Sequence, residues 1–228
     1  MKDKTRLIHA GRHPREHIGA VNVPVYRAST ILHPTMADLE GATLRYGYGR
    51  RGTPTTRGLE ELVCALEGGS RTVLTPSGLS ACTAALLAVL DAGDHLLMTD
   101  TVYGPTRAFC RGPLARFGIE TSCYPATATA AELEALIRPN TRALYLESPG
   151  SGTFEVQDVP ALAAAARARG LAVLMDNTWA TPLYCKPLAL GADISIAAAT
   201  KYFVGHADVL IGTITANEAY AKRLLALH

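Results

Sequence analysis

Two kinds of segment alternate along the chain from about residue 57 onward. Short apolar runs with little polar alternation are typical of strands buried on both faces, and they predict strands at 71–75, 95–100, 120–125, 141–148, 171–177 and 193–198. Longer segments, in which apolar residues recur with helical spacing, are typical of amphipathic helices. They predict helices at 57–69, 80–93, 104–118, 130–137 and 159–170. This alternation predicts an α/β domain, in which a mainly parallel sheet lies between helices.

Residues 1–55 follow neither pattern. They are basic and rich in glycine, proline and tyrosine, and only the stretch 34–42 has the spacing of a short helix. We therefore predict an irregular N-terminal arm over residues 1–55 and an α/β domain over residues 56–228.

Composition limits the classes of protein that these elements can form. The 228 residues are 48% hydrophobic and 18% charged, which allows one substantial core, and the formal net charge is +2. Basic residues are interspersed with acidic ones, so we expect no nucleic-acid partner. The start of the chain has no apolar segment suited to a signal peptide, and no run of about 18 apolar residues follows. We therefore expect a cytoplasmic protein that does not bind membranes.

The cysteines and histidines do not predict a metal site. The five cysteines are scattered and lack CxxC spacing, which indicates reduced thiols. His206 and Asp208 lie close together in the sequence, but no third ligand is near them.

Polar loops follow the predicted strands, and ligands of such sheets bind beyond the carboxyl ends of the strands. Lys201 comes directly after a run of small and apolar residues that ends at Thr200. A lysine held among apolar neighbours can react with a carbonyl as a neutral amine, whereas the plainer interpretation is a solvated lysine at the end of a strand. Asp176 ends the preceding strand, where a carboxylate either pairs with a ring nitrogen of a cofactor or caps a turn.

The stretch "TPSGLSACTAALLAVL" predicts a strand end, a tight turn and a helix start, where unpaired backbone amides can bind a phosphate. Gly78 lets a ligand approach the backbone closely, the Leu79 amide adds a second donor, and Ser77 offers a hydroxyl. By itself this signal is weak, because every strand-to-helix connection exposes such amides. Tyr103, in the next loop, is placed either to stack on a planar cofactor or simply to pack.

The arm contains "GYGRRG" at 47–52, which formally matches the GxGxxG motif of dinucleotide sites. We reject that interpretation, because no strand precedes the motif and Pro54 follows where a helix should open. Tyr48 and Arg50 are instead candidate phosphate partners, since a phenol and a guanidinium both donate to phosphoryl oxygens. The alternative is an ordinary exposed basic loop.

Motifs from nearly the whole chain resemble one enzyme family. They are "YGYGRRGTPTTRGLE", "SGLSA", "DTVYGP", "ESPGSGTFEVQDVP", "MDNTWATP" and "AATKYFVGHADVLIG". Together they resemble the Cys/Met-metabolism family of pyridoxal phosphate (PLP) enzymes, and within it the cystathionine β-lyase branch. The family's general pattern before its lysine is SxTK, whereas this chain has Ala198 in place of the serine, which removes one phosphate-binding hydroxyl. The AATK form is typical of the β-lyase branch.

The resemblance implies that PLP is the cofactor and that the fold is the type I fold of PLP-dependent transferases. Lys201 would form a Schiff base with the cofactor and shuttle the α-proton of the substrate. Asp176 would keep the pyridine nitrogen protonated, and Tyr103 would stack on the ring. Lys201 and Tyr103 are therefore the candidate catalytic residues.

The resemblance also implies how the phosphate is held. The amides of Gly78 and Leu79, together with Thr200, would bind it within one subunit. Tyr48 and Arg50 would reach the phosphate of a neighbouring subunit's cofactor. This role requires a homo-oligomer, either a dimer or a tetramer, with the cofactor site shared between subunits.

The implied reaction is α,β-elimination of L-cystathionine, a thioether amino acid, to homocysteine, pyruvate and ammonia. A γ-lyase or γ-synthase would use the same ring-binding residues and remains an alternative. Family members continue into a smaller C-terminal domain with an arginine for the substrate carboxylate, so we expect this chain to lack that domain and to have impaired activity. A catalytically idle PLP-binding fragment is therefore a second alternative. A nucleotide-binding protein that uses "SPGSGT" is disfavoured, because that loop lacks the P-loop lysine.

Overall fold

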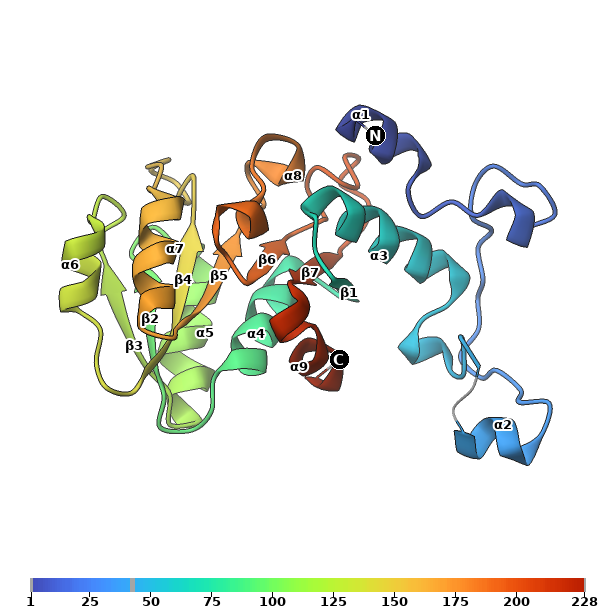
Figure 1. The fold of residues 1–228 in the computed structure, drawn as a ribbon, viewed down its shortest axis with the longest axis horizontal. Helices are drawn as coiled ribbons and strands as arrows, with labels where there is room; N and C mark the ends of the chain where they lie inside the picture. The colour runs from blue at the N-terminus through green and yellow to red at the C-terminus, as the bar shows by residue number, and fades with distance from the viewer. Residues whose placement is uncertain (1, 42–43, 228) are drawn as a thin grey trace. The chain divides into compact units, whose positions relative to one another are not determined.

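The computed structural model describes residues 2–41 and 44–227 (Figure 1). Contacts within the chain divide it into two compact units, Met1–Ala65 and Leu66–His228. Helix α3 (Pro54–Glu67) runs through this boundary and through the boundary expected between residues 55 and 56. The domain limits expected from the sequence therefore stay a prediction.

The first unit consists of short helical segments joined by extended chain. These segments are α1 (Asp3–His9), η1 (Pro14–Glu16), α2 (Met36–Gly41), η2 (Gly49–Arg51) and most of α3. The helix expected at 34–42 is found as α2. The sequence pattern does not predict α1, because none of its residues is buried and it therefore needs no apolar stripe.

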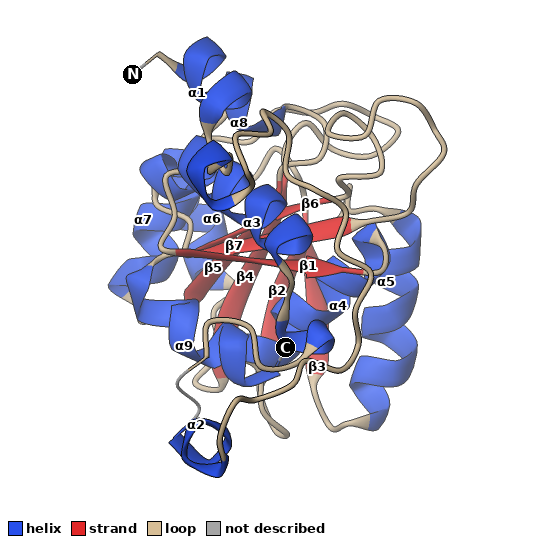
Figure 2. Ribbon diagram, turned by 90° about the vertical axis from the view of Figure 1, so that its right-hand side faces the viewer, coloured by secondary structure: helices blue, strands red, loops and turns tan. Residues whose placement is uncertain are grey.

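Within the described residues, the second unit is built around one seven-stranded sheet (Figure 2). Its strands are β1 (Arg71–Thr75), β2 (His95–Thr99), β3 (Glu120–Tyr124), β4 (Thr141–Glu147), β5 (Ala172–Asp176), β6 (Ile194–Ala197) and β7 (Gly212–Ala216). They lie in the order β1-β7-β6-β5-β4-β2-β3. The pairs among β2 to β6 are parallel, whereas β7 is antiparallel to both β1 and β6. The expected mainly parallel sheet is confirmed.

Strand β7 is the element of the sheet that the sequence pattern misses. Its five residues read GTITA, so two threonines interrupt an already short apolar run. Thr215 is nevertheless 1% exposed, because its hydroxyl shares a hydrogen bond of 2.8 Å with the hydroxyl of Thr72 on β1. A cross-strand threonine pair thus lets polar residues occupy a fully buried strand.

Helices cover both faces of the sheet. They are α4 (Gly78–Val89), α5 (Gly104–Phe109), η3 (Cys110–Leu114), α6 (Ala130–Ala135), α7 (Val159–Ala168), α8 (Thr181–Tyr184), η4 (Pro187–Leu190) and α9 (Glu218–Leu227). Figure 2 shows α4 and α5 on one side of the sheet and α6 and α7 on the other. Successive strand residues point to opposite faces, so Tyr145 joins the apolar cluster under α4, whereas Leu144 and Leu146 join the cluster under α7.

The helix expected at 104–118 is broken into two parts. Helix α5 ends at Phe109, and a π-helical turn, η3, follows with Pro113 inside it. Proline has no backbone N–H to continue the regular hydrogen bonds, which explains the change of pitch. Among the described residues, no helix has both the length and the apolar character that crossing a membrane requires.

Leu224 and Leu225 provide a matched test of how α9 packs. Leu224 is 1% exposed within the apolar cluster under α4, whereas Leu225 is 46% exposed. We expect Leu224→Ala to lower the free energy of unfolding by about 2–5 kcal/mol, because it leaves a cavity, and Leu225→Ala by less than about 0.5 kcal/mol. Chemical denaturation measures both values. Equal losses would show that α9 does not pack through Leu224.

Candidate active site

A cavity of about 670 Å³ lies in the second unit at the carboxyl ends of the parallel strands, and its volume suits a small-molecule site. Its walls include the segments that follow β1, β4, β5 and β6. Ser77 lines it, and so do six of the eight residues to which the resemblance assigns a role: Gly78, Leu79, Tyr103, Asp176, Thr200 and Lys201. Segments far apart in the sequence are thus brought to one place, although the role of each residue stays a prediction.

Asp176 ends β5 and is a buried carboxyl of the cavity, with 7% of the residue exposed. Its Oδ1 accepts a hydrogen bond of 2.9 Å from the Thr178 amide, and the Cys82 thiol lies 3.6 Å from Oδ2. Burial raises the pKa of Asp176, and the bonds from Thr178 and Cys82 oppose that rise. Within the described chain, no ion pair balances this carboxyl. A cationic group in the cavity would therefore be strongly favoured beside it.

Glu147, which the sequence analysis missed, is a second carboxyl beside Asp176. It ends β4, and the two residues are direct partners across the parallel strands. Burial, and then the charge of Asp176, raise the pKa of Glu147 to about 7. Its position at the end of a predicted strand, in "ESPGS", was a signal that could have identified it.

Glu147 also holds the loop between β2 and α5, which contains Tyr103. One of its oxygens accepts a hydrogen bond of 2.8 Å from the Tyr103 amide, and the other accepts a bond from the Ser151 hydroxyl. Tyr103 precedes α5 as its N-cap, and its side chain is half exposed on the cavity wall. The carboxyl therefore positions the backbone of Tyr103 and leaves the ring free to meet a ligand.

The phosphate-binding turn expected at Gly78 and Leu79 is found as the first turn of α4. The Ser77 hydroxyl accepts a hydrogen bond of 3.1 Å from the Ser80 amide and caps the helix, so it is already used. A Cβ added at Gly78 would lie 2.4 Å from the Cβ of Ala198. Only glycine allows this approach of α4 to the end of β6, and the helix start that results lines the cavity with Gly78 and Leu79.

Of the two interpretations of Lys201 that the sequence left open, burial among apolar neighbours and exposure at the end of a strand, the structure has the exposed one. The residues before it, Ile196, Ala197 and Ala199, are buried, but Lys201 itself is exposed on the cavity wall. The apolar run ends with the strand, and the chain then turns, so burial does not continue to the amine. Thr200 is tied down locally: its hydroxyl donates to the Ile211 carbonyl at 3.0 Å and accepts from the Ile211 amide at 2.9 Å.

Tyr48 and Arg50 belong to the first unit. The guanidinium of Arg50 lies over the ring of Tyr48, 5.9 Å from its centroid, and Tyr48 forms an isolated bridge with Thr30. Tyr48 is 43% exposed. The pair is thus preassembled within the arm, and the expected phosphate contact stays a prediction.

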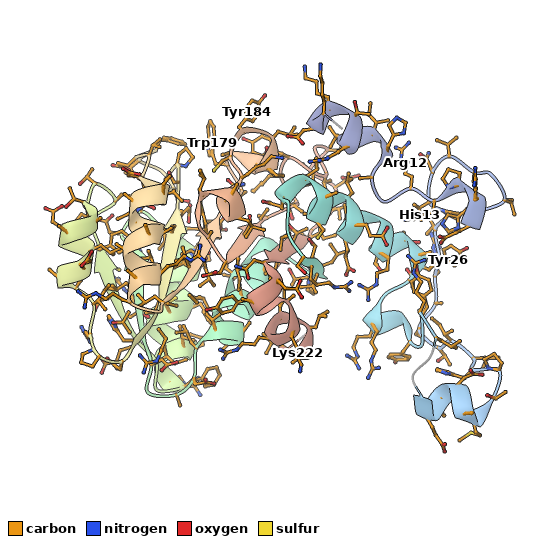
Figure 3. All side chains as sticks on the ribbon, in the orientation of Figure 1. Arg12, His13, Tyr26, Trp179, Tyr184 and Lys222 are labelled. Carbon is orange, nitrogen blue, oxygen red and sulfur yellow. The ribbon has the colours of Figure 1, made fainter. Side chains whose placement is uncertain are left out.

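Large apolar side chains that the sequence patterns did not identify also line the cavity. Trp179, labelled in Figure 3 on the loop after β5, is 56% exposed and stands edge-on to Phe154, with 6.0 Å between ring centroids. Tyr202 and Leu210 also line the cavity and are 61% and 74% exposed. Groups of histidine, cysteine or acidic residues suited to a metal do not occur within the described residues.

Three observations indicate that the residues present fit PLP. The buried Asp176 carboxyl suits a protonated ring nitrogen, which would supply the missing positive charge. The start of α4, held close to β6 by Gly78, suits an anionic phosphate. Lys201 supplies an amine on the same cavity for an aldehyde.

The sheet topology, the glycine at the start of α4 and the lysine and carboxyl on one cavity are features of the class of PLP-dependent enzymes. The chain belongs to the family of Cys/Met metabolism PLP-dependent enzymes, which it matches over residues 4–228. This membership confirms the resemblance found in the sequence, together with the expected fold class and the cofactor of the family.

Relatives match almost all of this chain but only part of their own. A putative cystathionine β-lyase of Rhizobium johnstonii is 50% identical over 220 residues, which are 96% of this chain and 55% of the relative. The cystathionine β-lyase MetC of Escherichia coli is 42% identical over 227 residues, which are 95% of this chain and 57% of the relative. A crystal structure of cystathionine γ-lyase from Lactobacillus plantarum, complexed with L-serine, is 35% identical and superposes with a TM-score of 0.93, covering 100% of this chain and 58% of that one. The chain thus spans less than two thirds of the length of these relatives.

The contact of Gly78 with Ala198 can be tested against a matched glycine. We expect Gly78→Ala to lower the free energy of unfolding by about 1–3 kcal/mol and to weaken PLP binding, because the added methyl group forces α4 away from β6. Gly104→Ala, also at a helix start, meets nothing within 4 Å and should leave both properties unchanged. Denaturation and a PLP titration measure the two effects. Wild-type behaviour of Gly78→Ala would contradict the tight approach.

The raised pKa of Glu147 makes stability depend on pH. Between about pH 4.5 and 7 the unfolded chain has released a proton that the folded chain retains, so the free energy of unfolding should fall as pH rises through this interval. Glu147→Gln cannot ionise, so we expect its free energy of unfolding to fall by about 1–3 kcal/mol less than that of the wild type over this interval. Denaturation at several pH values without PLP measures this difference.

Two further carboxyls serve as references for this experiment. Glu134→Gln, an exposed change on α6, should keep the full wild-type fall. Burial also raises the pKa of Glu67 to about 7, so part of the fall should persist in Glu147→Gln. An unchanged fall in Glu147→Gln would show that Glu147 ionises normally in the folded chain.

Proposed function

We propose that the protein is a PLP-dependent carbon–sulfur lyase that catalyses α,β-elimination of L-cystathionine to homocysteine, pyruvate and ammonia. The observation that carries the proposal is the cavity shared by Lys201 and Asp176, in which the amine is exposed on the wall and the carboxyl is buried. Membership in the Cys/Met metabolism family supports the cofactor. The names of the Rhizobium and Escherichia relatives support β-cleavage.

The cofactor, when bound, supplies an aldehyde for the substrate's amine and a ring that accepts the electrons released at the α-carbon. Asp176 would hold the ring nitrogen protonated, and burial strengthens that interaction because water cannot screen it. Tyr103 would lie against the ring, with its backbone held by Glu147. The amides of Gly78 and Leu79 would bind the phosphate.

Lys201 would bind the aldehyde in the resting enzyme and, once displaced by substrate, take the proton from the substrate's α-carbon. Its exposure on the cavity wall supports this role, because the amine must reach both the aldehyde and the α-carbon. Thr200 would reach the phosphate if its hydroxyl turns from the Ile211 carbonyl. This exchange would replace a neutral hydrogen bond by a charge-assisted one.

An assembly of several subunits is part of the proposal. Tyr48 and Arg50 would contact the cofactor phosphate of a neighbouring subunit. The large apolar side chains at the cavity, Trp179, Tyr202 and Leu210, are exposed in the single chain, which is expected of a surface that another subunit covers. The cytoplasmic location also stays a proposal.

Cleavage at the γ-position is the second candidate function. The Lactobacillus structure that resembles this chain is of a cystathionine γ-lyase, and the residues that would bind the ring are suited to both reactions. The products distinguish the two, since β-cleavage of cystathionine releases pyruvate and γ-cleavage releases 2-oxobutyrate.

Replacement of Lys201 tests the proposed function. We expect wild-type protein incubated with PLP to release pyruvate from cystathionine, and Lys201→Ala to lose this activity by about 10³-fold or more, because the proton transfer loses its base. Borohydride should attach the cofactor to the peptide that contains Lys201. Lys222→Ala, an exposed change on α9, serves as the control with wild-type turnover. Release of 2-oxobutyrate instead would establish γ-cleavage, and undiminished turnover by Lys201→Ala would refute the assignment.

A further inference from the structure

Cys82 is a buried thiol at the cavity that the proposed function leaves without a role. It lies on α4, is 3% exposed and contacts Asp176 Oδ2 through its sulfur at 3.6 Å. Burial and the charge of Asp176 raise the pKa of Cys82 well above its usual value. The thiol therefore keeps its proton and can act only as a donor to the carboxylate.

Two buried hydroxyls lie beside the same thiol. Tyr145 Oη on β4 and Thr106 Oγ1 on α5 belong to residues with 0% exposure, and neither has a hydrogen-bond partner of ordinary geometry within the described chain. Hydrogen bonding from these two hydroxyls nevertheless lowers the pKa of Cys82. Both hydroxyls therefore lie near its sulfur. Buried polar groups rarely remain without partners, and the Cys82 sulfur is a polar group that lies near both hydroxyls.

Cys82 adds to the donors that Thr178 gives Asp176. The Thr178 amide binds Oδ1, the Thr178 side chain also favours the ionised carboxyl, and the thiol reaches Oδ2. The other charged or titratable groups at this carboxyl are Glu147 on the neighbouring strand, Tyr145 on the same strand as Glu147, and Lys201 on the cavity wall. Glu147 disfavours a second negative charge, which makes the donors to Asp176 more important.

We propose that Cys82 is a positioning residue whose S–H group fixes Asp176 Oδ2 and keeps this carboxyl ionised for the cofactor ring, with Tyr145 and Thr106 orienting the thiol. The inference rests on the proposed function, because it takes Asp176 to face the ring nitrogen. It extends that function by assigning a role to a residue outside the set that touches the cofactor.

Two substitutions separate a donor from a packing residue. Cys82→Val keeps an apolar side chain of similar volume and removes the donor, whereas Cys82→Ser keeps a donor and loses apolar volume. If the thiol acts as a donor, Cys82→Val should require a higher pH to ionise Asp176, and Cys82→Ser should behave as wild type. If the thiol only fills space, the order reverses, with Cys82→Val unchanged and Cys82→Ser impaired.

The readout is the PLP dissociation constant as a function of pH, followed by quenching of Trp179, which lines the cavity and is the single tryptophan of the chain. We expect Cys82→Val to bind PLP roughly three- to tenfold more weakly on the acidic side and as tightly as wild type on the alkaline side. The acidic side is affected because a higher Asp176 pKa leaves more of the carboxyl protonated there. Cys82→Ser should restore the wild-type curve.

A second measurement keeps the inference independent of cofactor binding. Isotope-edited infrared spectra of aspartate carboxyls in the PLP-free protein, with Asp176→Asn to identify the band, should show the Asp176 pKa raised in Cys82→Val and not in Cys82→Ser. Failure of wild-type protein to bind PLP would overturn the proposed function and with it the role toward the ring. An unshifted Asp176 titration in a folded Cys82→Val protein would overturn the inference while leaving the proposed function intact.

Discussion

Two carboxyl groups, Asp176 and Glu147, end neighbouring parallel strands as direct partners, and the cavity is organised around the way in which their charges are held. Burial raises the pKa of both, so each charge requires donors or a cation. Glu147 obtains its donors from the Tyr103 amide and the Ser151 hydroxyl, whereas those of Asp176 come from Thr178 and the Cys82 thiol. Because Glu147 binds the Tyr103 amide, it holds the loop beside the cavity. In the described part of the chain Asp176 makes no such contact with that loop, and a positively charged ring in the cavity would stabilise its charge.

The approach of α4 to β6 determines where an anion can bind relative to these carboxyls. Gly78 lies against Ala198, and the strand and helix could not come so close with a side chain at position 78. Ala198 stands where the family pattern has a serine, so this wall offers a methyl group for close packing in place of a hydroxyl. The hydroxyls of Ser77 and Thr200 are used in local bonds, so the proposed phosphate site relies mainly on the backbone amides at the start of α4.

Sequence patterns were sufficient for most of the second unit and for six residues of the cavity. Their strength came from the topology of parallel sheets, which collects the loops after the strands at one edge, so that motifs distant in sequence could be assigned to one site. The patterns failed where burial did not follow from local composition. Strand β7 is buried although its run of five residues is interrupted by threonines, and Lys201 is exposed although the run before it is buried.

The sequence by itself determined the alternation of strands and helices, the glycine turn at 78 and the chemistry of the motifs, because these depend on local periodicity and on the conformational range of single residues. Only the tertiary structure decided the antiparallel insertion of β7 between β1 and β6, the pairing of Glu147 with Asp176, and the contact of Cys82 with Asp176 across 94 positions of the chain. These features depend on strand order and register, which arise from packing between distant segments and leave no period in the sequence.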